Sequence, residues 1–78
     1  MIEKDILIDK KNMYRLFSND HGDLFFATLC GSIGFYEIKF QLNEEEVAEY
    51  QRIGKSALDN LSCLVSKNAE FYLKRAIE

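Results

Sequence analysis

Proline is absent from this 78-residue sequence, and glycine occurs only four times. Disordered and low-complexity chains are usually rich in such residues and poor in hydrophobic ones. Here 47% of the residues are hydrophobic, so we expect a folded chain that needs neither a metal nor a disulfide. The length is that of one small domain, which we place over residues 1–78.

Long apolar runs are also lacking. Glu3, Lys4 and Asp5 interrupt the first apolar residues, whereas a secretory signal has a basic start followed by about 7–15 apolar residues. No stretch approaches the roughly 18 apolar residues of a membrane-spanning helix. We therefore expect a soluble, cytoplasmic protein that does not contact the membrane.

Residues suited to catalysis or metal binding are few. The chain has a single histidine, His21, and two cysteines, Cys30 and Cys63, outside any Cys-x-x-Cys pair. A zinc site usually takes three or four ligands, so we expect no metal and interpret both cysteines as small core residues. His21 lies in a predicted turn, and no spacing joins it to a nucleophile. The sequence also lacks a glycine-rich phosphate loop, so we expect no cofactor and no enzymatic activity.

A basic excess is missing as well, because 13 acidic and 10 basic residues give a net charge of −3. Nucleic-acid-binding proteins usually carry the opposite balance. A DNA-binding regulator remains an alternative, since Lys4, Lys10, Lys11 and Arg15 cluster near the start. However, no helix-turn-helix spacing follows them, so we expect no direct contact with nucleic acid.

Four segments have strand character. They are residues 2–9, 13–18, 24–30 and 35–42. The third is a continuous apolar run, typical of a strand that is buried on both faces. In the fourth, Tyr36, Ile38 and Phe40 alternate with polar residues and therefore share one buried face. The short polar segments 19–23 and 31–34 predict hairpin turns and an antiparallel meander.

Helical signals follow the strands. Asn43 and Glu46 have the spacing of a capping box, in which each side chain bonds the other residue's free backbone N–H. Apolar residues then recur at helical spacing. They are Val47, Tyr50, Ala57, Leu58, Leu61, Leu64 and Val65. Gly54 indicates either a kink or a break between two helices, and Asn68 is positioned to cap a last helix over residues 69–77.

The order of these elements indicates the fold class. Strands come first and helices afterwards, which is typical of α+β domains. We predict an antiparallel sheet of three to four strands, followed by two or three helices packed on one face.

Acidic residues supply the candidate binding surface. The partner-binding residues that we predict are Glu44, Glu45, Glu49, Asp59, Asp20 and Asp23. A surface of this charge complements a basic partner and steers its approach. The alternative interpretation is a solvated helix face, because carboxylates also stabilise the N-terminus of a helix. Four aromatic residues are further candidates for interface anchors if exposed. They are Tyr14, Phe25, Phe35 and Tyr72.

Several short motifs resemble a known class of proteins. They are the glycine turn and Tyr-Glu-Ile strand within residues 29–39, the Leu-Asn-Glu-Glu-Glu helix start at residues 42–47, and the Gly-x-x-Ala-Leu segment at residues 54–58. Together they resemble small immunity proteins of bacterial contact-dependent growth inhibition and related polymorphic toxin systems, over about residues 24–61. The resemblance implies a cytoplasmic inhibitor that binds the C-terminal domain of a cognate toxin, frequently a nuclease. It assigns no individual binding residue.

A second function class also fits the sequence. The chain could be a general protein-interaction or self-assembling module without a toxin partner. An edge strand over residues 2–9 would then pair across a dimer axis. The two classes differ in their partner, because one predicts a complex with a toxin and the other predicts a homodimer.

Overall fold

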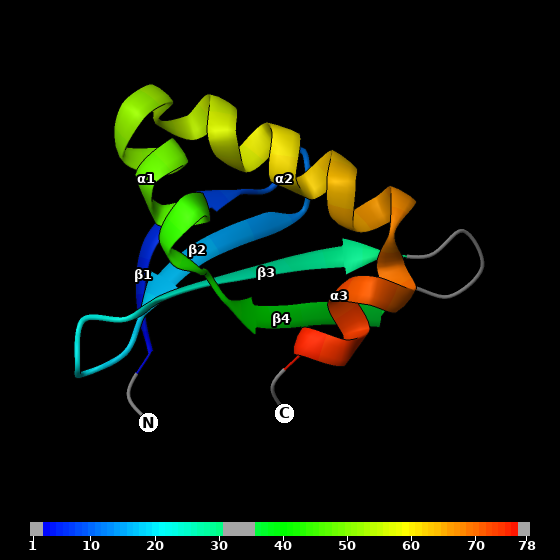
Figure 1. The fold of residues 1–78 in the computed structure, drawn as a ribbon, viewed down its shortest axis with the longest axis horizontal. Helices are drawn as coiled ribbons and strands as arrows, with labels where there is room; N and C mark the ends of the chain where they lie inside the picture. The colour runs from blue at the N-terminus through cyan, green and yellow to red at the C-terminus, as the bar shows by residue number, and fades with distance from the viewer. Residues whose placement is uncertain (1–2, 31–35, 77–78) are drawn as a thin grey trace.

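The computed structural model describes residues 3–30 and 36–76, and it confirms the α+β class. A four-stranded antiparallel sheet is followed by three helices that lie over one of its faces (Figure 1). The elements are β1 (Lys4–Asp9), β2 (Tyr14–Ser18), β3 (Leu24–Cys30), β4 (Tyr36–Gln41), α1 (Glu44–Ile53), α2 (Lys55–Lys67) and α3 (Ala69–Arg75).

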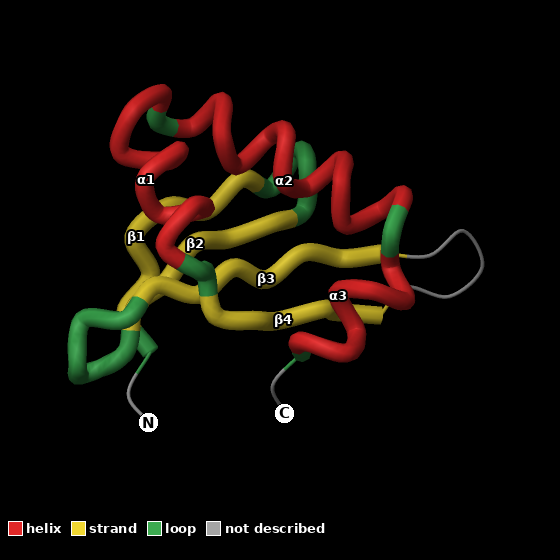
Figure 2. The backbone as a smooth tube through the Cα atoms, viewed as in Figure 1, coloured by secondary structure: helices red, strands yellow, loops and turns green. Residues whose placement is uncertain are grey.

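The sheet is a simple meander with strand order β1-β2-β3-β4 (Figure 2). The predicted turn at residues 19–23 is present. In it, the Asn19 side-chain oxygen accepts hydrogen bonds from the backbone N–H groups of His21 and Asp23, each at 3.0 Å. This local bonding replaces the ladder bonds that the turn residues lack. The predicted turn at residues 31–34 lies outside the described residues.

The main core lies between the sheet and the helices. Phe26 and Phe40 are fully buried there, and the Phe40 ring centroid is 5.9 Å from that of Phe26 and 5.1 Å from that of Tyr72 on α3. Ile38 is buried beside them as predicted, but the prediction for Tyr36 is wrong, because that side chain is 43% exposed. Tyr36 forms the last pair of the β3–β4 ladder, at the end of the sheet, where the helices cover it only in part.

The face of the sheet away from the helices, here called the open face, has a small core of its own. Phe17, Phe25 and Ala27 are buried together on it, with the two rings stacked at 5.4 Å. The Arg15 guanidinium lies 4.2 Å from the centre of the Phe17 ring. Since Phe26 and Thr28 are buried on the helical side, β3 is covered on both faces from Phe25 to Thr28, as its apolar run predicts.

Charged side chains form the cover over this second core. Glu3 pairs with Arg15 and with Lys39, each at 3.1 Å, and Asp5 pairs with Arg15 at 3.0 Å. We call these four residues the ion cover. Lys39, followed by Arg15, holds the pKa of Glu3 below its ordinary value. The ion cover therefore links β1 to β4 across the open face.

The helix boundaries follow from local bonding. The capping box at Asn43 and Glu46 is present with both bonds at 2.8 Å, and such caps stabilise a helix by about 1 kcal/mol. Gly54 separates α1 from α2 with a φ of 69°, which glycine adopts without the steric cost of a Cβ. Asn68 is the N-cap residue of α3, as predicted, but its side chain makes no capping bond there. The side-chain amide donates instead to the Leu64 carbonyl at 3.1 Å, at the end of α2. Helix α3 ends before residue 77, since Ala76 has an extended backbone.

Candidate partner-binding groove

An open groove of about 350 Å³ lies among α1, α2 and α3. We call it the helical groove. Its lining residues are Glu45, Glu46, Glu49, Ala57, Leu58, Asn60, Leu61, Leu64 and Tyr72. The apolar members come from α2 and α3, whereas every carboxylate comes from α1. The groove therefore combines an apolar floor with an acidic edge.

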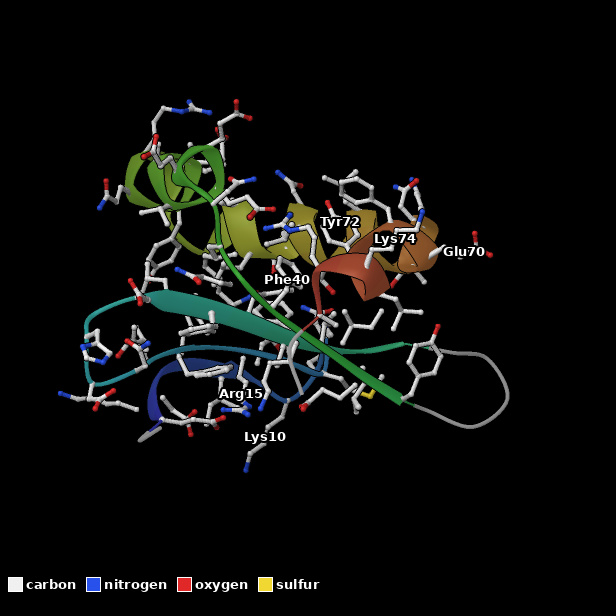
Figure 3. The ribbon with its side chains drawn as sticks, turned by 60° about the horizontal axis from the view of Figure 1, so that its bottom comes forward. Lys10, Arg15, Phe40, Glu70, Tyr72 and Lys74 are labelled. Carbon is white, nitrogen blue, oxygen red and sulfur yellow. The ribbon has the colours of Figure 1, made fainter. Side chains whose placement is uncertain are left out.

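Helix geometry places the two acidic residues side by side. Glu45 and Glu49 are four residues apart, so they lie on the same face of α1. Leu61 and Leu64 are three apart on α2 and face the groove together. Tyr72 closes the floor because its ring packs against that of Phe40, with the ring centroids 5.1 Å apart. Both residues are labelled near α3 in Figure 3.

The third carboxylate of the edge is already engaged. The Glu46 side chain accepts hydrogen bonds from Arg75 at 2.8 and 3.0 Å, and Arg75 also donates to the Gln41 carbonyl at 2.9 Å. The hydrogen bond to Glu46 is the main reason that the pKa of Arg75 is raised. Glu46 thus holds the helices together, and its charge is neutralised within the chain.

Glu45 and Glu49 remain available at the edge. Among the described residues Glu45 has no ion-pair partner, and Glu49 pairs only with the exposed Arg52 on its own helix. Exposed pairs of this kind contribute little and exchange readily with other partners. A lysine or arginine side chain fits such a site, because its aliphatic stem covers apolar surface while its charged end meets the carboxylates.

The six predicted binding residues do not form one surface. Glu45 and Glu49 line the helical groove, whereas Glu44 and Asp23 border a separate depression between the β2–β3 turn and α1. Asp20 lies in the same turn, with its carboxylate 3.9 Å from the exposed His21 ring. The turn and α1 are distant in sequence, so their proximity is visible only in the folded chain.

Asp59 lies on the opposite flank of α2. Its carboxylate accepts a hydrogen bond from the Tyr14 hydroxyl and pairs with Lys55 at 3.1 Å, and Lys55 also pairs with Asp9 at 2.7 Å. Burial, and then the bond to Asp59, raises the pKa of Tyr14 to about 12. The Tyr14 hydroxyl and then Lys55 lower the pKa of Asp59, and Lys55 lowers that of Asp9. These four residues, the helix–hairpin lock, tie α2 to β1 and β2.

The lock predicts a characteristic loss of stability in acid. Asp9 and Asp59 have lowered pKa values in the folded chain, so their pairing stabilises it above the unfolded aspartate pKa of about 4. As the pH falls below that value, protons bind the unfolded chain first and the stabilisation is lost. We expect Asp9→Asn to lower the free energy of unfolding at neutral pH and to converge with the wild type in acid. Urea titrations across this range measure the difference, and a gap that does not change with pH would contradict the prediction.

Exposed aromatic and apolar residues were not found by sequence reasoning. Tyr14, Phe25 and Tyr72 are buried, and Phe35 lies outside the described residues. Among the described residues, the exposed aromatic rings are those of Tyr36 and Phe71, and the Phe71 ring, at 59%, packs edge-on against Tyr72 with the ring centroids 5.1 Å apart. The core prediction for Cys63 is also wrong, because the residue is exposed. A helical wheel signals this outcome, since Cys63 lies about 200° from the buried Leu61.

Other kinds of site are not evident in the described chain. Nowhere in residues 3–30 and 36–76 do three His, Cys, Asp or Glu side chains gather as a metal site. None of the helices in these ranges has the length and apolar character needed to span a membrane. Comparisons with family models, curated proteins and solved structures found no match. The helical groove is therefore interpreted from its own chemistry.

Proposed function

We propose that this protein is a cytoplasmic immunity protein that binds a cognate bacterial toxin domain, a nuclease, and neutralises it by one-to-one association. The observation that carries the proposal is the helical groove, with Glu45 and Glu49 at the edge of an apolar floor. The resemblance of residues 24–61 to immunity proteins of polymorphic toxin systems supports the same class.

The chemistry of a nuclease makes it a suitable partner. Such enzymes hold the phosphate backbone of their substrate with lysine and arginine side chains. One of these side chains can place its stem on Leu61 and Leu64 and its charge between Glu45 and Glu49. The toxin residue is then unavailable to phosphate, or the bound inhibitor blocks the approach of the nucleic acid. Opposite charges on the two proteins also speed their encounter, by about 10-fold or more at low salt.

The alternative is an interaction module that pairs through the edge of its sheet. The exposed edge strand β1 is poorly suited to this role. Its register with β2 shifts between Asp5 and Leu7, which marks a bulge, and charged residues lie at both of its ends. Bulges and charges are the usual means by which edge strands avoid pairing with another chain. These features favour a partner that binds the helical face.

Co-expression with the product of the neighbouring upstream gene, as the candidate toxin, tests the proposal. We expect a stable one-to-one complex in pull-down and size-exclusion experiments, and growth of cells that the toxin alone would kill. A catalytically inactive toxin serves as the control, because it does not kill the cells and therefore shows whether the complex forms independently of cell survival. If no complex forms and the cells die, the immunity function is wrong.

A further inference from the structure

Within residues 3–30 and 36–76, only half of the open face of the sheet is covered by other side chains. The ion cover protects Phe17 and Phe25, but beyond it Ile8, Met13 and Leu29 are 55%, 42% and 37% exposed. A shallow depression of about 300 Å³ lies there. Its lining residues are Ile8, Asp9, Lys10, Met13, Tyr14, Arg15, Ala27, Leu29 and Glu37. We call Ile8, Met13 and Leu29 the bare patch.

The β3 residues that face the open side of the sheet are apolar, which favours contact between the bare patch and another surface. Phe25, Ala27 and Leu29 alternate along the strand and point to the open face. A sheet face that meets water usually carries polar residues at such positions. The chain covers the first two of these residues itself, whereas Leu29 is left exposed. The apolar row therefore continues past the ion cover that the described residues provide.

Charges of opposite sign flank the bare patch on its two sides. On one side lies the β1–β2 turn, with Lys10 and Met13, and the Met13 carbonyl accepts the Leu29 backbone N–H at 3.0 Å. On the other side lies β4, where Glu37 pairs directly with Leu29 in the ladder. Within the described residues neither Lys10 nor Glu37 forms a salt bridge. Figure 3 shows Lys10 and Arg15 on the side of the sheet away from the helices.

We infer that a second copy of this chain covers the bare patch, face to face, about a two-fold axis that runs parallel to the strands. Such an axis exchanges the two sides of the patch. Lys10 of each copy then meets Glu37 of the other, and Met13 meets Leu29. A partner carrying charge of one sign would satisfy only one of the two flanking residues, whereas an identical copy satisfies both. Face-to-face packing of twisted sheets is a common arrangement.

This interface is independent of the proposed function. The helical groove lies on the other layer of the molecule, so the dimer leaves both grooves free. Loss of dimerisation and loss of toxin binding are therefore separate results, obtained with different variants.

Sedimentation velocity over a wide range of protein concentration tests the inference. We expect the mass to rise from the 9.1 kDa of one chain towards twice that value. Lys10→Glu and Glu37→Lys should each weaken the dimer by about tenfold, and the double variant should regain it, because the charges are exchanged. Lys11→Glu is the matched control, since Lys11 makes the same charge change outside the depression.

Two outcomes overturn the inference. One is a wild-type chain that stays at 9.1 kDa at every concentration. The other is a dimer that neither Leu29→Asp nor the single charge reversals weaken, because its interface then lies elsewhere. Circular dichroism shows whether each variant is folded. The charge reversals lie on exposed side chains, so they preserve the test if Leu29→Asp fails to fold.

Discussion

Replacing Phe40 by alanine should lower the free energy of unfolding by about 3–5 kcal/mol, which is the usual cost of removing a buried phenylalanine ring. Phe40 is fully buried and lies between Phe26 and Tyr72, with the Arg75 guanidinium 4.6 Å from its ring centre. The cavity would thus open where β4 meets α3. A chain of this length has a stability on the order of 5 kcal/mol, so the variant should retain at most about 2 kcal/mol and have a much larger unfolded fraction than the wild type.

Phe71→Ala is the matched control for that experiment. It removes the same side chain from a position one residue away from Tyr72, but Phe71 is mostly exposed. We expect a change within about 0.5–1 kcal/mol. Urea denaturation followed by circular dichroism compares the two variants. Equal losses would mean that the core does not centre on Phe40.

Reversing both charges at the edge of the helical groove should abolish the toxin neutralisation that we propose. In the double variant Glu45→Lys and Glu49→Lys, two cations replace two anions beside the apolar floor. A cationic partner then meets repulsion, and we expect association to slow by about 100-fold or more at low salt. Stopped-flow or surface-binding kinetics against the toxin domain measure the rate, and cell survival gives the functional result.

The second acidic depression supplies the control for the groove variant. Asp23→Lys with Glu44→Lys makes the same change in net charge, on residues that border a different hollow. We expect this variant to retain protection, with an association rate lowered only by the change in overall charge. If the two double variants behave alike, the partner responds to net charge and the helical groove is not the binding site.

The elements of this fold could be predicted because their signals are local. Strand alternation around Ile38, the Asn43–Glu46 capping box and the break at Gly54 each depend on residues within a few positions. The side-chain bond of Asn68 was not predicted, because this residue lies between two helices and its amide can bond the backbone of either one. It donates to the Leu64 carbonyl of α2 and makes no capping bond to α3. Sequence spacing alone does not decide between two such partners.

The candidate site was only partly predictable. Glu45 and Glu49 were predicted because they belong to a cluster of acidic residues, but their apolar floor depends on how α2 and α3 pack against α1. Asp59 has the same charge as they do, yet it faces β1 and β2 and serves the helix–hairpin lock. Contacts between helices and strands decide which acidic residues share a surface. The spacing of residues along the sequence does not predict those contacts.

The meander also bears on how quickly the chain reaches its native state. Every strand pairs with the next one along the chain, and the turns between β1, β2 and β3 are short. Short loops cost little entropy to close, and folds dominated by near-neighbour pairing cross their folding barrier faster than those with distant pairings. Each hairpin can therefore form soon after its second strand leaves the ribosome. An inhibitor of the kind that we propose must be folded before its toxin becomes active, so it would gain directly from this order of assembly.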